Sequence, residues 1–247
     1  MPFGLTPGLA VALALALLLA AFVRGYSGFG FSAVVLAFAA LVTDPRPLIP
    51  VLFTCEILLS ALQARSIRGH VDWRRTFLLW AGAAVAIPLS VFALVRMPAD
   101  VARLAVSAIV GVLSLVLLGG WQIRRRLGAT GHVAVGAVSG LANGAGVGGL
   151  PVAAMLAAQP VSAAQFRGTL VAYITGMDLM TLPVMGAAGL MSGQTLAGVA
   201  LALPLLALGM MAGNRRFALA APQEFRRLVI LLLLALSLIG VARALLA

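Results

Sequence analysis

The stretch GLANGAGVGG, residues 140–149, decides how the second half of this chain folds. It interrupts an apolar run and leaves the segments 131–143 and 146–158 on its two sides. Each segment is shorter than the roughly 17 apolar residues that a helix needs to cross a bilayer. The run is therefore expected to form two short helices, or a hairpin that dips into a membrane and returns.

An equivalent cluster lies near the start of the chain, where GYSGFG at residues 25–30 separates the apolar segments 7–23 and 27–43. Glycine breaks a helix, and a broken helix at membrane depth is tolerated only where it lines protein or water. The positive N-terminal end of a half-helix favours an anion. Glycines also let membrane helices pack closely, which is the simpler explanation. Because two clusters occupy corresponding positions, we favour a binding site.

The composition indicates a membrane protein. Of the 247 residues, 63% are apolar and 9% are charged, whereas an ordinary soluble domain has about 25% charged residues. This excludes a soluble enzyme, a nucleic-acid-binding protein and a disordered tail. The net charge of +11 comes from arginines that lie between apolar runs, as membrane topology requires. The prediction is an all-α polytopic membrane protein with about eight to ten membrane segments. The apolar segments are 7–23, 27–43, 48–64, 74–95, 99–121, 131–143, 146–158, 163–184, 194–213 and 223–246.

The chain contains an internal repeat, which predicts one integral transport domain made of two membrane repeats, residues 1–125 and 126–247. Three blocks match in the same order: Gly28 and Gly30 with Gly144 and Gly146; Pro45, Thr54 and Ser60 with Pro160, Thr169 and Thr175; and residues 98–104 with 222–228. The offset drifts between blocks, as small loop insertions would produce.

The arginines indicate how the repeats are oriented. The odd-numbered breaks between the ten segments carry twelve arginines, and the even-numbered breaks with the C-terminus carry four. The positive-inside rule then puts the odd breaks in the cytoplasm and both termini in the periplasm. Break three, RSIRGHVDWRR at 65–75, has four arginines, whereas its repeat mate MGAAGLMSG at 185–193 has none. Equivalent loops with opposite charge favour inverted repeats. The alternative is two parallel repeats with four crossings each. This topology would distribute the arginines almost equally between the two faces of the membrane.

Two carboxyl groups lie inside apolar segments. Glu56 is near the middle of 48–64, and Asp178 is in the second half of 163–184. A charge within the bilayer costs at least about 2.5–3.5 kcal/mol, so such residues usually face a pathway or a partner. Each belongs to a polar stripe at helical spacing, and the two stripes are expected to face each other. We predict that Glu56 and Asp178 are proton or coupling sites; a purely structural carboxylate is the alternative.

The candidate substrate ligands are polar or glycine residues in and near the two clusters. They are Ser27, Gly28, Gly30, Asn143, Gly144, Gly146, Thr54, Thr169 and Arg167. For Arg167, which lies about one turn into its segment, three roles stay open: binding an anion, pairing with a carboxylate, or reaching the lipid headgroups. Arg24 adjoins the first glycine cluster at a cytoplasmic break; topology alone explains it, and attraction of an anion would be an additional effect. No catalytic residue, metal site or cofactor is expected, because one cysteine, two histidines and no phosphate-binding motif offer no such chemistry.

Three motifs resemble the sulfite exporter TauE/SafE family: GYSGFGFS at 25–32, HVDWRR at 70–75 and GLANGAGVGGLP at 140–151. The resemblance spans nearly the whole chain. It implies a permease of the bacterial inner membrane that exports sulfite or small organosulfonates, with the glycines of both clusters as signature elements. The expected function is a secondary transporter of small sulfur-containing anions. The alternatives are a passive anion channel and a membrane assembly partner without transport. The expected partners are a small anion and membrane lipid, with no nucleic acid; homo-oligomerisation stays open.

Overall fold

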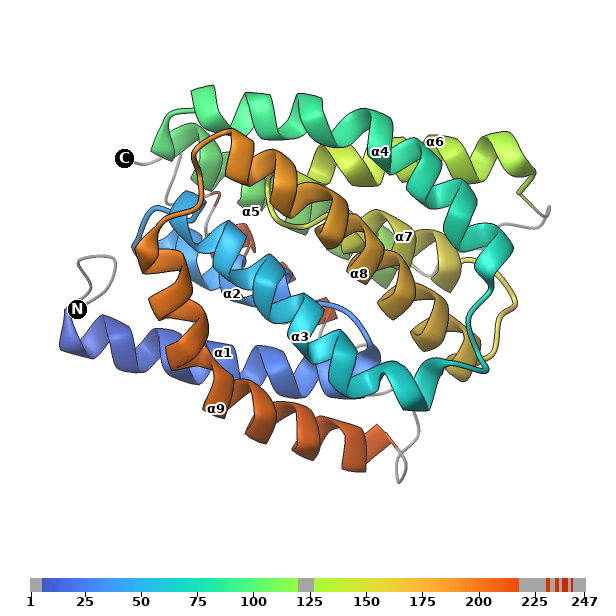
Figure 1. The fold of residues 1–247 in the computed structure, drawn as a ribbon, viewed down its shortest axis with the longest axis horizontal. Coiled ribbons are helices and arrows are strands. Elements are labelled where there is room, and N and C mark those ends of the chain that lie inside the picture. Colours follow the sequence, from blue (N-terminus) through green and yellow to red (C-terminus); the bar gives the residue numbers. More distant parts are fainter. Residues whose placement is uncertain are drawn as a thin grey trace.

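Helices form all the regular secondary structure of the described part of the chain, which confirms the all-α prediction. The structure is a computed structural model that describes residues 6–119, 127–217 and eight residues between 230 and 241. The helices are α1 (Pro7–Ser27), α2 (Phe31–Val42), η2 (Arg46–Leu48), α3 (Ile49–Ile67), α4 (Trp73–Arg96), α5 (Ala99–Leu118), α6 (Ala129–Asn143), α7 (Gly149–Ala157), α8 (Ala163–Ala187) and α9 (Gly193–Phe217) (Figure 1).

Nine of the ten apolar segments correspond to one helix each. Six helices in the described residues are long and apolar enough to cross a membrane: α1, α3 with η2, α4, α5, α8 and α9. The chain is therefore a multi-pass membrane protein. Most of the tenth segment, 223–246, and the arginines at 124–126, 226, 227 and 243 lie outside the described residues, as does the match between 98–104 and 222–228.

At each of the two glycine clusters, one helix ends and a short helix begins. Helix α1 starts at a Thr6 cap, which accepts a hydrogen bond from the N–H of Leu9 at 3.4 Å, and stops at Gly28, whose φ is +81°. Gly30, with φ +88°, then starts α2. At 1.5 Å per residue, the 12 residues of α2 and the 9 of α7 span about 18 and 14 Å, short of a bilayer's ~30 Å.

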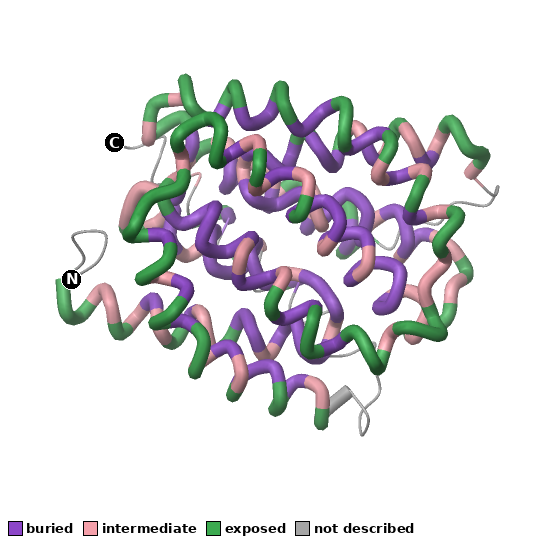
Figure 2. Tube along the Cα trace, viewed as in Figure 1, coloured by how far each residue is buried: buried purple, intermediate pink, exposed green. Residues whose placement is uncertain are grey.

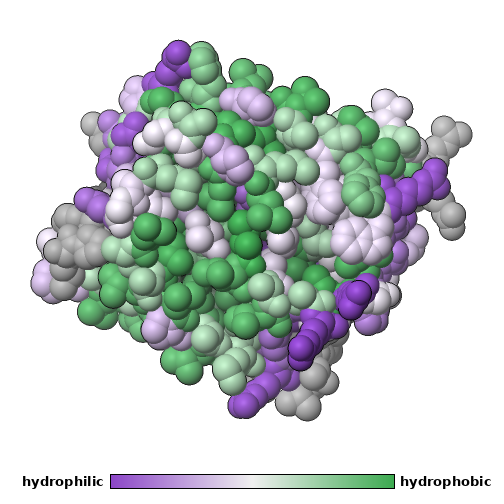
Figure 3. Space-filling view, in the orientation of Figure 1, coloured by the Kyte–Doolittle hydropathy of each residue, from purple (hydrophilic) through white to green (hydrophobic). Residues whose placement is uncertain are grey.

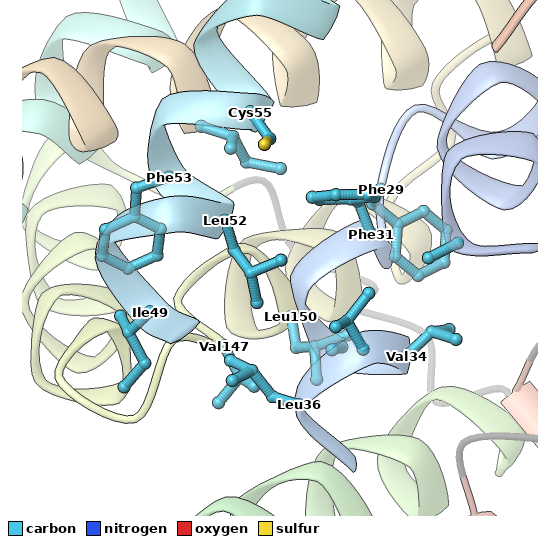
Figure 4. Close-up of a cluster of buried hydrophobic side chains, with 14 of the residues drawn as sticks. Phe29, Phe31, Val34, Leu36, Ile49, Leu52, Phe53, Cys55, Val147 and Leu150 are labelled. Carbon is cyan, nitrogen blue, oxygen red and sulfur yellow. The ribbon is translucent and has the colours of Figure 1, made fainter. Parts of the chain in front are cut away.

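Both short helices are enclosed by the others. Most residues of α2 and α7 are buried, whereas the outer faces of the long helices are exposed (Figure 2). An apolar cluster from α2, α3 and the start of α7 surrounds them, including Phe31, Leu36, Phe53 and Leu150 (Figure 4). Cys55, a free thiol, is part of this cluster. The irregular backbone of each glycine cluster is thus shielded from lipid by protein.

Glycines also bring long helices into close contact. On α4 and α6, a Cβ at Gly82 or Gly136 would overlap backbone atoms of the partner helix, and one at Gly140 would lie 2.8 Å from a carbonyl oxygen. On α1 and α9, a Cβ at Gly25 would lie 2.7 Å from the carbonyl oxygen of Met210. Helix α1 therefore packs along α9, and α4 packs along α6. Close helix packing thus accounts for Gly25 and Gly140.

The centre of the fold is the pair α3 and α8, which contact each other and run in opposite directions (Figure 1). Apolar side chains form a broad band across the surface, and hydrophilic side chains gather toward two opposite edges (Figure 3). This is the distribution expected of a bundle that crosses a membrane.

The loop between α2 and η2 is held by an ion pair. The Arg46 guanidinium lies 2.6 Å from the Asp44 carboxylate and also donates to the carbonyl oxygen of Met97 at 2.6 Å. Partial burial alone would raise the pKa of Asp44. The hydrogen bonds from the side chain and backbone of Arg46 outweigh that effect and lower this pKa below its ordinary value of 3.8.

Candidate functional site

The two glycine clusters meet at a small cavity inside the bundle. The first turn of α2 contributes Gly30 and Ser32, and the second cluster contributes Gly146 and the residues that open α7. Glu56 on α3 completes the polar lining together with Asn143. The cavity offers about 20 Å³ to the centre of a water molecule, enough for one or two waters. Four predicted site residues, Gly30, Asn143, Gly146 and Glu56, therefore line the same cavity.

Both short helices point their N-terminal ends at this cavity. Ser32 is in the first turn of α2, and Gly149 and Leu150 open α7. The first N–H groups of a helix have no partner within the helix, and they carry the positive end of its dipole. The cavity therefore lies at two electropositive backbone ends, which is chemistry that suits an anion.

The side-chain amide of Asn143 is hydrogen-bonded through its nitrogen, whereas its oxygen is an acceptor without a partner among the described residues. Its side-chain N–H donates to the Thr181 hydroxyl at 2.9 Å, and Thr181 donates to the carbonyl oxygen of Met177 at 2.7 Å. Because Thr181 already donates, the amide orientation of Asn143 is fixed. Asn143 is fully buried, and its Oδ1 has no hydrogen-bond partner within the described residues. This oxygen can accept a hydrogen bond from a protonated ligand or from water.

A hydrogen-bonded chain holds the second cluster in place. The Tyr173 hydroxyl donates to Ser139 at 2.7 Å, and Ser139 donates to the carbonyl oxygen of Gly148. The positive φ of Gly146, +74°, completes the turn before α7. Sequence reasoning missed Ser139, since a single serine on an apolar helix gives no signal until its partner on α8 is known.

Arg24 is a buried member of this site, which corrects its assignment to a cytoplasmic break. It lies inside α1, has no exposed surface, and places its guanidinium 3.5 Å from the Glu56 carboxylate. The same guanidinium donates to the Ser60 hydroxyl at 2.9 Å. A buried carboxylate needs such a partner, because an isolated charge in the interior is very costly. The stripe of Glu56 and Ser60 on α3 therefore faces α1.

The two predicted coupling carboxyl groups are neighbours. Glu56 and Asp178 interact with each other and with Arg24, and Glu56 also lies beside the hydroxyl and N–H of Ser32. Asp178 is fully buried, and neither of its oxygens has a donor among the described residues. Two carboxylates cannot donate to each other, so a hydrogen bond between them needs one shared proton.

Arg167 lies next to this cluster but does not line the cavity. Its guanidinium donates to the side-chain oxygen of Asn214, which also accepts from Gln63 at 3.3 Å. A Cβ at Gly28 would lie 2.8 Å from the Arg167 side chain, so Gly28 serves close packing as well as the turn. Arg167 lies within electrostatic range of Arg24. Asn214, which Arg167 and Gln63 share, carries no signal in the sequence.

The other candidate ligands bond elsewhere. The Ser27 hydroxyl bonds the carbonyl oxygens of Val23 and Phe29 within its own turn, at 2.8 and 2.9 Å. The Thr54 hydroxyl donates to the backbone of its own helix at 2.8 Å. Thr169 accepts from the N–H of Asp72 at 3.0 Å, in the loop before α4. A fourth candidate, Gly144, packs on the backbone of α4. The structure places these four residues outside the cavity lining.

The comparison with known protein families matches a stretch of the chain that includes both glycine clusters and the charged cluster of Arg24, Glu56, Arg167 and Asp178. The family model described as Sulfite exporter TauE/SafE matches residues 13–239. The chain belongs to the sulfite exporter TauE/SafE family. TauE/SafE proteins are membrane transporters of sulfur-containing anions, which agrees with a bundle of apolar helices around an anion-friendly cavity. No curated protein and no solved structure matches the chain.

Proposed function

We propose that this TauE/SafE protein is a secondary transporter that exports a small sulfur-containing anion, such as sulfite or an organosulfonate, across the bacterial inner membrane. One observation carries the proposal: the N-terminal ends of α2 and α7 converge on a single cavity. Anionic oxygens of the substrate would bind at the positive N-terminal ends of these two helices. The unpartnered Oδ1 of Asn143 would accept a hydrogen bond from a protonated oxygen or an ammonium group of the same substrate.

The balance of charge around the cavity supports binding of an anion. Arg24, Arg167, Glu56 and Asp178 form one electrostatic neighbourhood. With one proton shared between the two carboxyl groups, the four side chains carry one net positive charge, which a monovalent anion would neutralise. With both carboxyl groups ionised, the net charge is zero and the attraction is lost. Protonation of the Glu56–Asp178 pair would therefore control anion affinity, and this is the coupling role we assign to it.

The direction of transport depends on whether that proton travels. The membrane potential, negative inside, favours exit of an anion by about 2.3 kcal/mol per charge per 100 mV. A uniporter that keeps its proton on the carboxyl pair would therefore export without further coupling. Movement of one proton with one monovalent anion transfers no net charge, so the potential would not drive it. Dependence of flux on the potential separates the two mechanisms.

We further infer that the chain consists of two inverted repeats, with eight to ten membrane segments when the short helices are counted. The packing supports this inference. The repeat offset pairs α1 with α6 and α4 with α9, and the contact of α1 with α9 is mirrored by that of α6 with α4. The repeat mates α3 and α8 run in opposite directions (Figure 1). In this topology the arginine-rich odd breaks are cytoplasmic and both termini are periplasmic.

Flux in proteoliposomes tests the transport proposal. Purified protein is reconstituted, and uptake of sulfite and of several C2 sulfonates is measured at imposed membrane potentials, with and without a pH gradient. We expect saturable uptake with counterflow, which indicates a carrier; linear flux without counterflow would indicate a channel. Glu56→Gln should reduce uptake at least tenfold. Asp100→Asn is the matched control, because it makes the same change at an exposed carboxylate.

Two outcomes would contradict the proposal. Absence of flux for every sulfur anion, in protein that remains folded by circular dichroism, would favour the assembly-partner alternative. Wild-type flux in a Glu56→Gln, Asn143→Ala double variant would remove the cavity from the transport path, even if transport itself is confirmed.

A further inference from the structure

A second, larger hollow lies on the outside of the bundle, between α3, α8 and the start of α4. This groove has a volume of about 530 Å³ and is open along one side. Its walls are mostly apolar, and they include Ala61, Ala64, Ala172, Gly176 and Trp80. Trp80 packs directly against Gly176, and its ring N–H donates to the carbonyl oxygen of Tyr173 at 2.9 Å. The aromatic wall of the groove is therefore fixed in place.

The lining excludes the groove as a path for an anion. Besides arginines, its polar side chains include Ser60 and Thr175. The Ser60 hydroxyl accepts from Arg24 at 2.9 Å, and the Thr175 hydroxyl donates to its own helix at 2.7 Å. Neither hydroxyl group can replace the hydrogen bonds from water that a sulfur anion would lose on entering the groove. An apolar occupant is favoured, because an acyl chain needs no replacement for hydrating water when it lies against these apolar walls, whereas an anion does.

One end of the groove carries unpaired positive charge. Arg65 and Arg68 line this end, are exposed, and form no ion pair among the described residues. Trp73 lies beside them, 48% exposed, with its ring 6.4 Å from that of Trp80. Arginines and exposed tryptophans at the end of an apolar surface are typical of the membrane–water interface. An anionic headgroup would meet two guanidinium groups there.

We propose that this groove is a binding site for an anionic phospholipid, with one acyl chain between α3 and α8 and the phosphate at Arg65 and Arg68. A phosphate accepts bidentate hydrogen bonds from guanidinium groups. A second copy of the chain fits less well, because a two-fold interface at the groove would bring two arginine-rich loops together. The bound chain would contact Ser60, the residue that holds Arg24, and would thereby support the charged cluster from outside.

Lipid retention tests this site without any measurement of transport. Purified protein in detergent micelles is titrated with dioleoyl phosphatidylglycerol or dioleoyl phosphatidylcholine, and bound lipid is counted by native mass spectrometry. We expect one tightly bound phosphatidylglycerol per chain. Because each arginine near an anionic headgroup contributes about 1 kcal/mol, the Arg65→Gln, Arg68→Gln double variant should bind it about 30-fold more weakly and bind phosphatidylcholine unchanged.

A second variant tests the acyl-chain part of the site. Ala61→Phe places a ring in the groove from an exposed position on α3 and should weaken binding of both lipids. Val85→Phe, at a position 81% exposed and outside the groove lining, is the matched control and should bind as wild type. Equal lipid binding in Ala61→Phe and wild type would overturn the proposal. So would a stable dimer that Ala61→Phe disrupts, because the groove would then be an interface between chains.

Discussion

Replacement of Arg24 by Met should destabilise the protein by an amount that depends on pH. The Arg24 guanidinium lies 3.5 Å from the Glu56 carboxylate, and both side chains are buried. At an effective dielectric constant of about 20, two unit charges at that separation attract by about 5 kcal/mol. Without Arg24, Glu56 would have to stay charged and lose this attraction, or take up a proton before it is buried.

Protonation of Glu56 costs less free energy than burial of its charge without Arg24, so the cost of protonation is the one that would be observed. A glutamic acid side chain in water has a pKa of about 4.3, and each pH unit above it costs 1.36 kcal/mol when the side chain must be neutral. The cost is about 3.7 kcal/mol at pH 7 and about 1 kcal/mol at pH 5. At neutral pH the folded variant binds one more proton than the folded wild type, so its stability relative to wild type must rise as the pH falls.

Unfolding by SDS in mixed micelles, followed by tryptophan fluorescence at pH 7, 6 and 5, measures this difference. Arg74→Met is the control, since Arg74 is exposed and forms no ion pair among the described residues; it should change stability by under about 0.5 kcal/mol at every pH. The Arg24→Met, Glu56→Gln double variant removes both charges of this ion pair, so neither is left without the other, and most of the lost stability should return. A destabilisation that stays constant between pH 7 and pH 5 would refute the reasoning.

Three further predictions concern packing, the surface loop and transport. Gly82→Ala should cost about 1–3 kcal/mol, because the new methyl group overlaps the backbone of α6; Gly8→Ala, with open space around it in α1, should not lower the thermal unfolding midpoint. Asp44→Asn should cost under about 1 kcal/mol at pH 7 and progressively less as the pH falls below 3.8. Arg46 lowers the pKa of Asp44, so this stabilisation is present above pH 3.8 and disappears as the pH falls through the lowered pKa. Asn143→Ala should reduce sulfite uptake at least tenfold with helix content unchanged; wild-type uptake would remove Asn143 from the site.

Much of what the sequence predicted about the fold and the cavity came from the two glycine clusters. Composition and break positions were sufficient to predict an all-helical membrane bundle and a short helix after each glycine cluster, although α2 and α7 begin four and three residues later than the predicted segments 27–43 and 146–158. Both signals are local, since a run of apolar residues or a cluster of glycines acts on its own stretch of chain. Gly30 and Gly146 line the cavity, but Gly144, given the same role, packs on α4 instead. The sequence pattern did not separate the two uses of glycine, because both need a missing side chain.

The charged and polar partners were the part that the sequence could not predict. Arg24 follows an apolar run like a topology signal, and only the position of α3 shows that it is buried against Glu56. Asn143 and Thr181 are 38 residues apart, and Gln63 and Asn214 are 151 apart. Such pairs depend on which helices pack together, and no local periodicity encodes that.

The contact between α1 and α9 sets a time constraint on biosynthesis. Helix α1 ends at Ser27 and α9 begins at Gly193, and the glycine at position 25 fits against α9. At about 5–20 residues per second, a ribosome needs about 10–30 s to make the chain between them. During that interval the glycine face of α1 lies in the bilayer without α9 packed against it. The glycine face of α1 is thus packed late in synthesis, and truncated or stalled chains would present that face to other membrane proteins and to the quality-control proteases that survey them.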